Sequence, residues 1–346
     1  MSDIDIRIIG KAGRITLTRP KALNALSYDM CMAIDTALRA WATNDTVDLV
    51  VIDAEGDKAF CAGGDIAELY DTGTQGNYGY SRKFWRDEYR LNARIFEYPK
   101  PIVSFLQGFT MGGGVGIGCH GTHRIVGESS QISMPEVGIG LVPDVGGTLM
   151  LALASGRLGE YLGLTSTRMG ADDAILAGFA DHFIAQDKWP DMISTLETDG
   201  DTSCLDTAAS APPTGKLRDL QDDINRHFGG ETLGDILNSL RAEDSDFSAT
   251  TLKTLTRHSP LSMACTVEML HRLRSTSLSI RKALELEYRF THRAMEHSDF
   301  LEGIRALIID KDRNPQWQHG DMNVPASTVS QMLQPLRGEA LTFEEG

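Results

Sequence analysis

The sequence contains no unbroken apolar run of about 18 residues, the length that a membrane-spanning helix requires. It is also poor in basic residues, with 33 Lys and Arg against 48 Asp and Glu and a formal net charge of −15. Proteins that hold nucleic acids through the phosphate backbone need basic patches, which this balance does not favour. We therefore expect neither a membrane span nor a nucleic-acid partner.

The cysteines lack the regular spacing of a metal site; they are Cys31, Cys61, Cys119, Cys204 and Cys265. An odd, scattered set is typical of free thiols in a reducing compartment. The start of the chain is acidic and lacks the basic segment of a secretory leader. It also lacks the Arg- and Ser-rich composition of a mitochondrial transit peptide. From these absences we expect a cytoplasmic protein with no bound metal.

The chain of 346 residues is 41% apolar, which is enough for a sizeable core. Its composition changes near 198–215, a stretch rich in Thr, Ala, Ser and Pro that is typical of a linker or surface excursion. We predict a core over residues 1–190 and a linker or surface excursion over 191–215. A mainly helical region over 216–346 is expected to pack on the core.

Strand and helix signals alternate in the first half of the chain. Apolar runs and alternation predict strands at Ile4–Ile9, Arg14–Thr18, Val47–Ile52 and Ile102–Leu106. Ser27 is positioned to cap a helix whose apolar face consists of Met30, Ile34, Ala37, Leu38 and Trp41. Helical periodicity returns over Phe84–Phe96, after a polar loop predicted at Gly73–Tyr80.

Capping residues indicate where further helices begin. Asp65 is positioned to cap a helix that starts at Ile66, with Glu68 as its capping-box partner. The same signals predict three helix starts in the last third of the chain, at Ser259-Pro260, Ser279 and the pair Asp299 and Glu302.

Two glycine-rich loops are the most informative local features. The first, Gly56–Ile66, follows the predicted strand Val47–Ile52 and leads into the helix expected to start at Ile66. The second is the run Gly112–Gly114. Consecutive glycines allow backbone N–H groups to approach a ligand oxygen closely, because no Cβ intervenes. At a helix start those N–H groups also carry a partial positive charge.

Two carboxylates follow the second loop, Glu136 after a proline and Asp144 before Val145-Gly146-Gly147. Near a loop with outward N–H groups, such carboxylates suit acid–base or nucleophilic work on a polarised carbonyl. Each also has a structural alternative. Glu136 would then be a solvent-facing turn residue, and Asp144 the N-cap of the helix that follows.

In this order the motifs resemble the crotonase (enoyl-CoA hydratase/isomerase) superfamily. The matching strings are F-C-A-G-G-D-I at 60–66, M-G-G-G at 111–114 and P-E-x-x-I-G-L-x-P-D-x-G-G at 135–147. The resemblance implies an α/β fold, a crotonase-like spiral of ββα turns followed by a mainly helical C-terminal region. It also implies an oxyanion hole for an acyl-CoA thioester, with the backbone N–H groups of Gly64 and Gly113 as donors.

Two positions narrow the resemblance to one branch. Hydratases of the superfamily carry a glutamate where this chain has Gly116, and most members carry glycine where it has Asp144. These departures resemble the 3-hydroxyisobutyryl-CoA hydrolase family, as do W-R-D-E-Y at 85–89 and the segment 299–317. The resemblance implies hydrolysis of a small 3-hydroxyacyl-CoA thioester, as in valine breakdown.

The same resemblance assigns roles to individual residues. Glu136 and Asp144 are implied as catalytic residues, and both are also implied to bind substrate together with Glu88 and Gly113. Whether Glu136 attacks the carbonyl or activates a water is left open. No metal or redox cofactor is implied, because coenzyme A is part of the substrate. A homo-oligomer is compatible with the superfamily.

Two other functions remain as alternatives at this point. A Δ3,Δ2-enoyl-CoA isomerase works with Glu136 alone as a proton shuttle, but it has no need for the carboxylate of Asp144. A non-catalytic crotonase-fold protein that binds RNA or a ribosome fits poorly with the acidic balance of the chain and with the pair of carboxylates.

Overall fold

The computed structural model describes residues 3–343 and divides into two compact units. The first unit contains the chain up to Gly64 together with Arg90–Ser133 and Arg168–Leu217. The second contains Asp65–Tyr89, Met134–Thr167 and the chain from Arg218 onward. Each unit is therefore assembled from separated segments. The boundaries predicted from the sequence divide the chain differently and stay a prediction.

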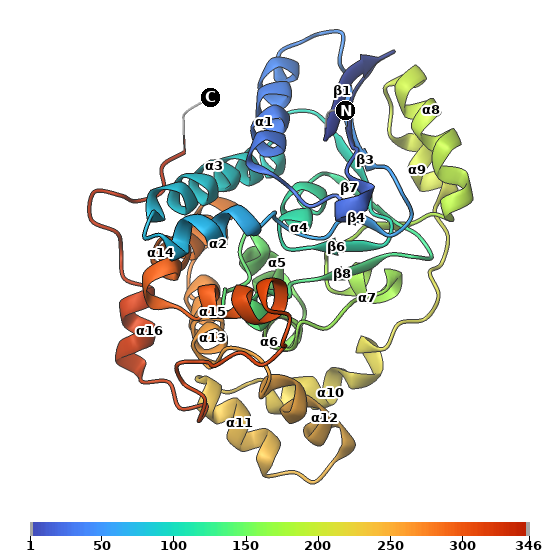
Figure 1. The fold of residues 1–346 in the computed structure, drawn as a ribbon. Coiled ribbons are helices and arrows are strands. Elements are labelled where there is room, and N and C mark those ends of the chain that lie inside the picture. The colour runs from blue at the N-terminus through green and yellow to red at the C-terminus, as the bar shows by residue number, and fades with distance from the viewer. Residues whose placement is uncertain (1–2, 344–346) are drawn as a thin grey trace. The chain divides into compact units, whose positions relative to one another are not determined.

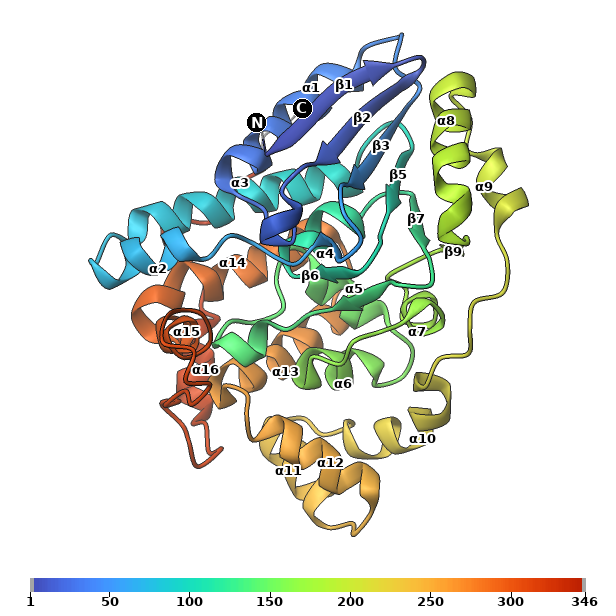
Figure 2. The same ribbon diagram turned by 45° about the vertical axis from the view of Figure 1, so that its right-hand side comes forward.

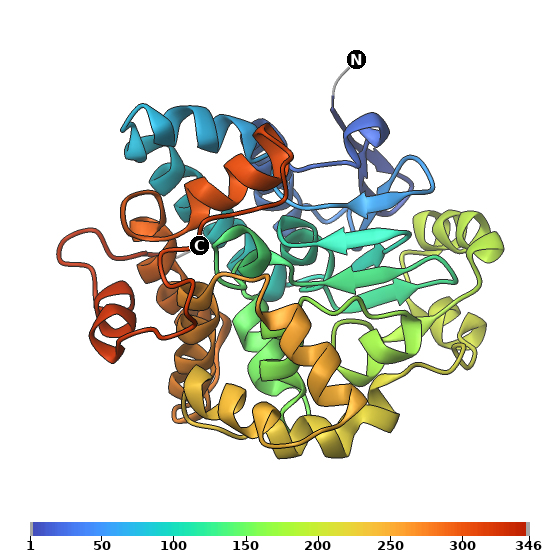
Figure 3. The same ribbon diagram turned by 60° about the horizontal axis from the view of Figure 1, so that its bottom comes forward.

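The first unit holds two sheets. Within residues 3–343, six strands form the larger sheet, in the order β1 (Ile4–Ile9), β2 (Ala12–Leu17), β3 (Leu49–Ala54), β5 (Ile102–Phe105), β7 (His123–Val126) and β9 (His182–Phe183). β1 and β2 form an antiparallel hairpin, and every later neighbour pairs in parallel. The smaller sheet consists of β4 (Ala59–Cys61), β6 (Phe109–Met111) and β8 (Gln131–Ser133), which lie side by side in Figure 3.

The order of these strands describes a spiral. Along the chain, β3, β5 and β7 enter the larger sheet, and each is followed by one strand of the smaller sheet, β4, β6 or β8. Parallel neighbours need a crossover connection, so the chain must travel around the unit between successive strands of one sheet. This arrangement, with a mainly helical C-terminal region after it, confirms the fold class predicted from the sequence.

Five whole helices accompany these sheets within the described part of the first unit, together with the end of α3 (Tyr78–Phe96): α1 (Tyr28–Ala42), α4 (Gly113–Gly118), α7 (Ala171–Leu176), α8 (Trp189–Asp199) and α9 (Ser203–Ala208). Short 3-10 turns occur at η1 (Pro20–Ala22) and η3 (Gln186–Lys188). Ser27 caps α1 as predicted, since its hydroxyl accepts a hydrogen bond from the N–H of Met30 at 3.2 Å. The predicted apolar face of α1 is buried.

The core of the first unit lies between the larger sheet and α8, which runs beside the strands in Figure 2. Apolar side chains of the sheet, including Val51, Val103 and Phe105, pack there against Trp189 and Leu196 of α8. Strands buried on both faces read as nearly continuous apolar runs, as Leu49–Ile52 does. The first glycine loop of the sequence follows β3, one of the strands that this core holds in place.

The second unit is built of helices. They are α2 (Ala67–Thr74), the first part of α3 (Tyr78–Phe96), α5 (Gly147–Leu153), α6 (Leu158–Thr165), α10 (Leu217–His227), α11 (Leu233–Arg241), α12 (Asp246–Leu255), α13 (Pro260–Arg274), α14 (Ile280–His297), α15 (Phe300–Ile304) and α16 (Ala326–Met332). A 3-10 turn, η2 (Glu136–Ile139), and a π-helical turn, η4 (Arg305–Ile309), complete it. Figure 1 labels most of these elements.

Helices α5, α6, α13 and α14 form the packed centre of the second unit. α13 and α14 begin where the sequence predicts. The hydroxyls of Ser259 and Ser279 accept hydrogen bonds from the third residue of each helix, at 3.1 and 3.3 Å. None of the helices formed by residues 3–343 combines the length and the apolar character that a membrane crossing requires.

Two predicted caps are wrong. Helix α2 begins at Ala67, and neither Asp65 nor its preceding residues cap it with a side chain. Glu68 instead accepts a hydrogen bond from the hydroxyl of Tyr80 at 2.6 Å. Asp299 precedes α15, but its carboxylate accepts from Ser259 and from the N–H of Gln318. The carboxylate oxygens of Glu68 and Asp299 therefore accept hydrogen bonds from distant residues instead of from the N–H groups at the helix start.

Two predicted loops are largely helical. The polar stretch Gly73–Tyr80 contains the end of α2 and the start of α3, so only 75–77 lie outside a helix. Residues 191–215, predicted as a linker or surface excursion, contain most of α8 and all of α9. Burial of Ile193, Leu196 and Leu205 against the sheet explains why this polar composition still forms helices.

Candidate active site

Three carboxylates predicted as site residues gather in the second unit. Glu88 lies on α3, Glu136 begins η2, and Asp144 lies in the segment that leads from η2 to α5. Their exposed fractions are 3%, 4% and 4%, respectively. Ionisable side chains are rarely buried to this extent unless they are paired, so a solvent-facing turn role for Glu136 is excluded.

Asp144 is not the N-cap that the local sequence suggests. Helix α5 begins at Gly147 after Gly146, and no side chain next to the helix start caps it. The Asp144 carboxylate instead accepts a hydrogen bond from the hydroxyl of Tyr89 at 2.7 Å. The backbone between Asp144 and α5 is unusual, because Val145 has a φ of 53°. A β-branched residue in that region is strained and needs support from its surroundings.

Glu287 of α14 supplies that support. Its carboxylate accepts hydrogen bonds from the N–H of Gly146 at 2.8 Å and from the N–H of Thr148 at 3.0 Å. It also accepts from the hydroxyl of Thr148. Glu287 therefore performs from a distant helix the capping task that sequence reasoning gave to Asp144, and its own side chain is fully buried.

Sequence reasoning missed both Glu287 and Tyr89. A signal for Glu287 was present, because it occupies a position on the apolar face of α14 that is otherwise lined by Ala283, Leu284 and Ala294. A glutamate on such a face needs a buried partner. Tyr89 directly follows Glu88 in the W-R-D-E-Y string, but nothing local marks it as the donor to Asp144.

The four carboxyl groups influence one another's protonation. Burial raises the pKa of Asp144 to about 7, although the hydrogen bond from Tyr89 opposes the rise. Burial, followed by the charge of Asp144, raises the pKa values of Glu136 and Glu88 well above their usual range. Burial raises the pKa of Glu287 to about 8, against the hydrogen bond from Thr148. Raised pKa values among buried carboxyl groups are typical of sites that carry out acid–base chemistry.

Glu136 has one oxygen without a protein partner. Its Oε2 is buried and makes no hydrogen bond within the part of the chain that the structure describes. An unsatisfied buried carboxylate oxygen costs stability, typically about 1–3 kcal/mol, so its retention needs a reason outside folding. A reacting carbonyl or a water in front of this oxygen would provide that reason.

The two predicted oxyanion glycines lie in the first unit. Gly64 follows β4 and forms a parallel bridge with Leu26, while Gly113 is the first residue of α4 and follows β6. Because β4 and β6 pair in parallel, the two loops leave the smaller sheet at the same end, the carboxyl end of these strands. N–H groups in the first turn of a helix have no acceptor within that helix, so the N–H of Gly113 is not used by α4.

Close packing explains the glycine run at the start of α4. A Cβ on Gly114 would lie 2.1 Å from the carbonyl oxygen of Cys61, so this position admits only glycine. Gly116, where hydratases of the superfamily carry a glutamate, is a buried residue inside α4. The chain therefore presents no acidic side chain from that helix.

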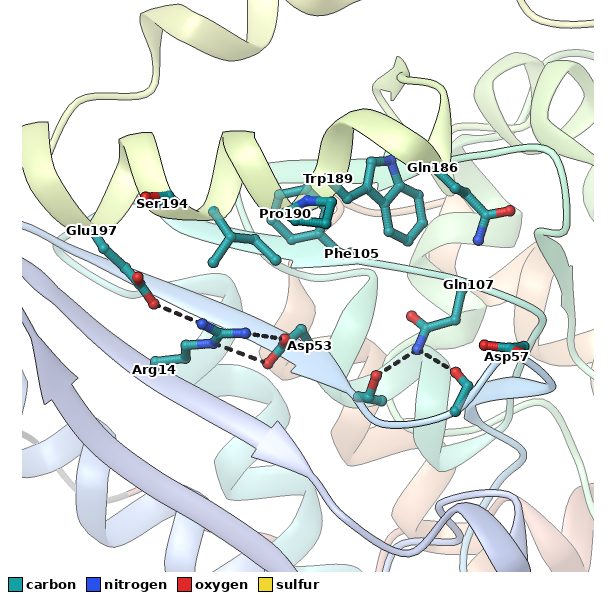
Figure 4. A pocket seen from close by; sticks show the side chains of 13 residues that line it. Arg14, Asp53, Asp57, Phe105, Gln107, Gln186, Trp189, Pro190, Ser194 and Glu197 are labelled. Atoms are coloured by element: carbon teal, nitrogen blue, oxygen red, sulfur yellow. Dashed lines mark hydrogen bonds and ion pairs between the residues drawn. The ribbon is translucent and has the colours of Figure 1, made fainter.

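A cleft in the first unit is a separate feature. It has a volume of about 590 Å³ and is lined by residues such as Arg14, Asp53 and Glu197, which Figure 4 shows joined by ion pairs of 2.7 and 2.8 Å. At the other end of the cleft, the side-chain amide of Gln107 donates to the backbone carbonyls of Ala54 and Gly56. None of the predicted site residues lines this cleft, so it is not the candidate active site.

No cluster of three or more His, Cys, Asp and Glu side chains arranged to hold a metal occurs within residues 3–343. The expectation that the protein works without a metal or redox cofactor stays a prediction.

Comparison with known proteins agrees with this fold and these motifs. A family model described as Enoyl-CoA hydratase/isomerase matches residues 12–333. The chain is 37% identical to the mitochondrial 3-hydroxyisobutyryl-CoA hydrolase of Danio rerio over 92% of its own length and 85% of the relative. It is 36% identical to the human protein of the same name, over 90% and 83% of the two chains.

Two solved structures are similar over the whole chain. One, titled an enoyl-CoA hydratase from Rhodobacter sphaeroides 2.4.1, is 57% identical with a TM-score of 0.95 and covers 99% of this chain and 100% of its own. The other, titled a carnitinyl-CoA dehydratase from Mycobacterium thermoresistibile, is 36% identical with a TM-score of 0.94 and full coverage of both chains.

The expected cytoplasmic location is wrong by this comparison, because the curated relatives are mitochondrial proteins. The prediction rested on free thiols and on the composition of the first residues. Free thiols indicate a reducing environment without singling out the cytoplasm, and targeting segments are removed without being part of the fold.

The matched family model covers nearly the whole chain, and the spiral of paired strands, the two glycine loops and the carboxylate after the second loop all occur in the matched order. This chain belongs to the enoyl-CoA hydratase/isomerase family.

Proposed function

We propose that this protein hydrolyses the thioester of a small 3-hydroxyacyl-CoA, with 3-hydroxyisobutyryl-CoA as the preferred substrate. One observation carries the proposal. Glu136 and Asp144 are buried together in a cluster of carboxyl groups, whereas the glutamate that a hydratase would carry at position 116 is replaced by glycine. The curated relatives named 3-hydroxyisobutyryl-CoA hydrolase support the same activity.

Oxyanion stabilisation is assigned to the two glycine loops. The backbone N–H groups of Gly64 and Gly113 would donate to the thioester oxygen as negative charge develops on it. One such donor is typically worth roughly 3–4 kcal/mol of barrier. Glycine suits both positions, because a carbonyl can approach the backbone without meeting a Cβ.

Bond cleavage is assigned to Glu136. In one route its carboxylate attacks the thioester carbon, the C–S bond breaks, and water then hydrolyses the acyl-enzyme anhydride. In the other route Glu136 takes a proton from a water that attacks directly. In both routes the net reaction consumes one water and yields the free acid and the CoA thiol. A raised pKa makes the ionised carboxylate a stronger base than an exposed glutamate.

Asp144 and Glu88 are assigned to the 3-hydroxyl group of the substrate. Burial raises the pKa of both carboxyl groups; the hydrogen bond from Tyr89 opposes this rise at Asp144, whereas the charge of Asp144 adds to it at Glu88. Asp144 would accept a hydrogen bond from the substrate hydroxyl, and Glu88 in its protonated form would donate one to it. A buried acceptor left without its partner is costly, so an acyl group that lacks the hydroxyl would bind poorly.

A hydratase is the second candidate, because the similar structure from Rhodobacter sphaeroides is named an enoyl-CoA hydratase. Addition of water to a double bond needs an acid and a base on the two carbons. The family's second glutamate is absent at Gly116, so Glu136 would need Asp144 or Glu88 to replace it. A Δ3,Δ2-enoyl-CoA isomerase needs Glu136 alone and leaves Asp144 without a task.

The deciding experiment offers the purified protein three substrates in parallel. Release of CoA from 3-hydroxyisobutyryl-CoA is followed with a thiol reagent, hydration of crotonyl-CoA by the loss of its conjugated absorbance, and isomerisation of a 3-enoyl-CoA by the gain of that absorbance. We expect fast thiol release and little change in the other two assays. Hydration or isomerisation faster than thiol release would contradict the proposal.

Three further properties belong to the proposal. The physiological context is valine breakdown, where this thioester is an intermediate. Coenzyme A enters and leaves as part of the substrate, with no additional cofactor. A homo-oligomer is compatible with the family, and sedimentation of the purified protein at several concentrations would measure its state.

A further inference from the structure

Asp144 is the only one of the predicted catalytic groups that the described chain holds from two sides. Its side chain receives a hydrogen bond from Tyr89, and the backbone just after it is bound by Glu287. Neither residue has a role in the reaction as proposed so far. Both are fully buried, and both come from helices that are far from Asp144 in the sequence.

We propose that Tyr89 and Glu287 are positioning residues that hold the Asp144 carboxylate in one orientation for the 3-hydroxyl group of the substrate, an inference that rests on the proposed hydrolase function. Tyr89 fixes the carboxylate itself. Glu287 fixes the backbone from which that carboxylate projects. Neither touches the thioester.

The backbone argument begins at Val145. This residue and Gly146 have φ values of 53° and 82°, so the chain turns sharply through the left-handed region between Asp144 and α5. Such a turn persists at a β-branched residue only when its surroundings hold it. Glu287 holds it with both oxygens, which accept from Gly146, from the N–H of Thr148 and from the hydroxyl of Thr148.

The side-chain argument concerns Tyr89. Its ring is fully buried and makes an edge contact with Tyr288, with ring centroids 6.2 Å apart. A tyrosine has a single hydroxyl proton, and the shorter of its two contacts, 2.7 Å to Asp144 against 3.4 Å to Thr291, takes it. One oxygen of Asp144 is thus fixed by Tyr89, and the further lone pairs of the carboxylate can accept a hydrogen bond from a substrate hydroxyl.

The hydrogen bond from Tyr89 is important for the ionisation of Asp144, because the ionisable neighbours of Asp144 are mainly other carboxyl groups. The groups that face Asp144 are Glu88 and Tyr89 from α3, Glu136 from η2 and Glu287 from α14; none of them is a cation. The hydrogen bond from Tyr89 is the side-chain interaction that favours ionised Asp144, because it lowers a pKa that burial raises. Without it, the carboxylate would hold its proton to higher pH.

The test uses Tyr89→Phe and Glu287→Gln, with the full-length enzyme. Tyr89→Phe removes only the donor. Glu287→Gln keeps the volume but replaces one acceptor by an NH2 group that must face a backbone N–H. Tyr288→Phe is the matched control for the tyrosine, since its hydroxyl donates to the carbonyl of Arg82 at 3.2 Å. Glu160→Gln is the control for a buried glutamate held by Arg157 and Arg274.

The first readout is the preference for 3-hydroxyisobutyryl-CoA over isobutyryl-CoA, measured as a ratio of kcat/KM values. We expect each positioning variant to lower this ratio by about tenfold, because a mispositioned acceptor no longer binds the substrate hydroxyl well. The two control variants should keep the ratio, even where their melting temperatures fall. A general loss of stability lowers the amount of active enzyme without changing which substrate is preferred.

The second readout is the pH profile of kcat/KM in Tyr89→Phe. Loss of a hydrogen bond to a charged group should move the acidic limb upward by about one pH unit. The same shift should appear in the carboxyl ¹³C resonance of Asp144, assigned by its absence in Asp144→Asn, which needs no turnover.

The outcomes separate the inference from the proposed function. If wild type releases no CoA but the Asp144 resonance titrates about one unit higher in Tyr89→Phe, the hydrolase assignment fails and the positioning by Tyr89 stands. If wild type hydrolyses its substrate while both variants keep the wild-type substrate ratio and the acidic limb stays in place, the inference is overturned.

Discussion

Two sites in the second unit bury glutamates almost completely, and they differ in the charged groups that surround those glutamates. Glu160 of α6 is fully buried and is held by the guanidinium groups of Arg157 and Arg274, with N–O distances of 2.9 and 3.0 Å. Glu136 and its neighbours Glu88, Asp144 and Glu287 are buried to a similar degree, but the charges that act on them are those of other carboxyl groups.

The difference separates a structural carboxylate from one that we propose to be reactive. Arginine partners compensate the charge of Glu160, and removal of that charge would leave the arginines unpaired. The cluster around Glu136 has no such compensation among the described residues, so its protons are held more tightly and its pKa values rise. Burial by itself therefore does not indicate catalysis, whereas burial among like charges does.

The largest expected effect comes from Glu136→Gln, which keeps the size and polarity of the side chain but removes its basicity and nucleophilicity. We expect kcat for thioester hydrolysis to fall at least about a hundredfold, the low end for a general base. Acyl-CoA binding, measured by calorimetry, should largely survive. Glu160→Gln should instead lower stability and spare activity: we expect a loss of about 3 kcal/mol in unfolding free energy and a near-normal kcat per folded molecule. Normal turnover by Glu136→Gln would contradict the assignment.

The glycine loops of the first unit allow a test that depends on a single N–H group. A Cβ on Gly64 meets no described atom within 4 Å, so Gly64→Ala should fold and keep its donor. Gly64→Pro occupies the same open space but lacks the N–H. We expect the alanine variant to stay within a few-fold of wild type and the proline variant to lose about a hundredfold in kcat, as expected for one oxyanion donor. Equal activity in the two variants would argue against Gly64 as a donor.

Asp144→Asn should change which substrate is preferred more than it changes catalysis in general. The amide can still meet the substrate hydroxyl, but it cannot supply the charged acceptor. We expect the ratio of kcat/KM for 3-hydroxyisobutyryl-CoA over isobutyryl-CoA to fall by about tenfold. Equal losses for both substrates would place Asp144 in proton transfer at the thioester instead of at the hydroxyl.

The smallest effect is on stability, and its sign follows from the pKa of Asp144. The folded value of about 7 lies above the ordinary value near 3.8, so between these limits the folded state binds more protons than the unfolded state. This group therefore makes the wild type less stable as pH rises through that window. Asp144→Asn lacks the group and does not share this loss. The melting temperature of the variant minus that of wild type should therefore be a few degrees larger at pH 8 than at about pH 5. A difference that does not depend on pH would mean that burial does not raise this pKa.

Sequence reasoning identified the parts of the site that depend on local spacing. The two glycine loops, the position of Glu136 and the caps at Ser27, Ser259 and Ser279 all follow from residues a few positions apart. It failed where a local rule competed with a distant partner. Asp299 has the spacing of a cap, but the hydroxyl of Ser259 donates to its carboxylate instead.

The sequence alone determined the ββα spiral, the family and the glycine loops, because backbone conformation and motif order depend on neighbouring residues. Its assignment of Glu136 and Asp144 as the catalytic carboxylates stays a prediction. What only the tertiary structure decided is how those carboxylates are held. Glu287 reaches the Asp144 segment from α14, and Tyr89 reaches Asp144 from α3. The pKa of a buried acid depends on desolvation and on charges brought near it by folding, and neither quantity has a local signature in the chain.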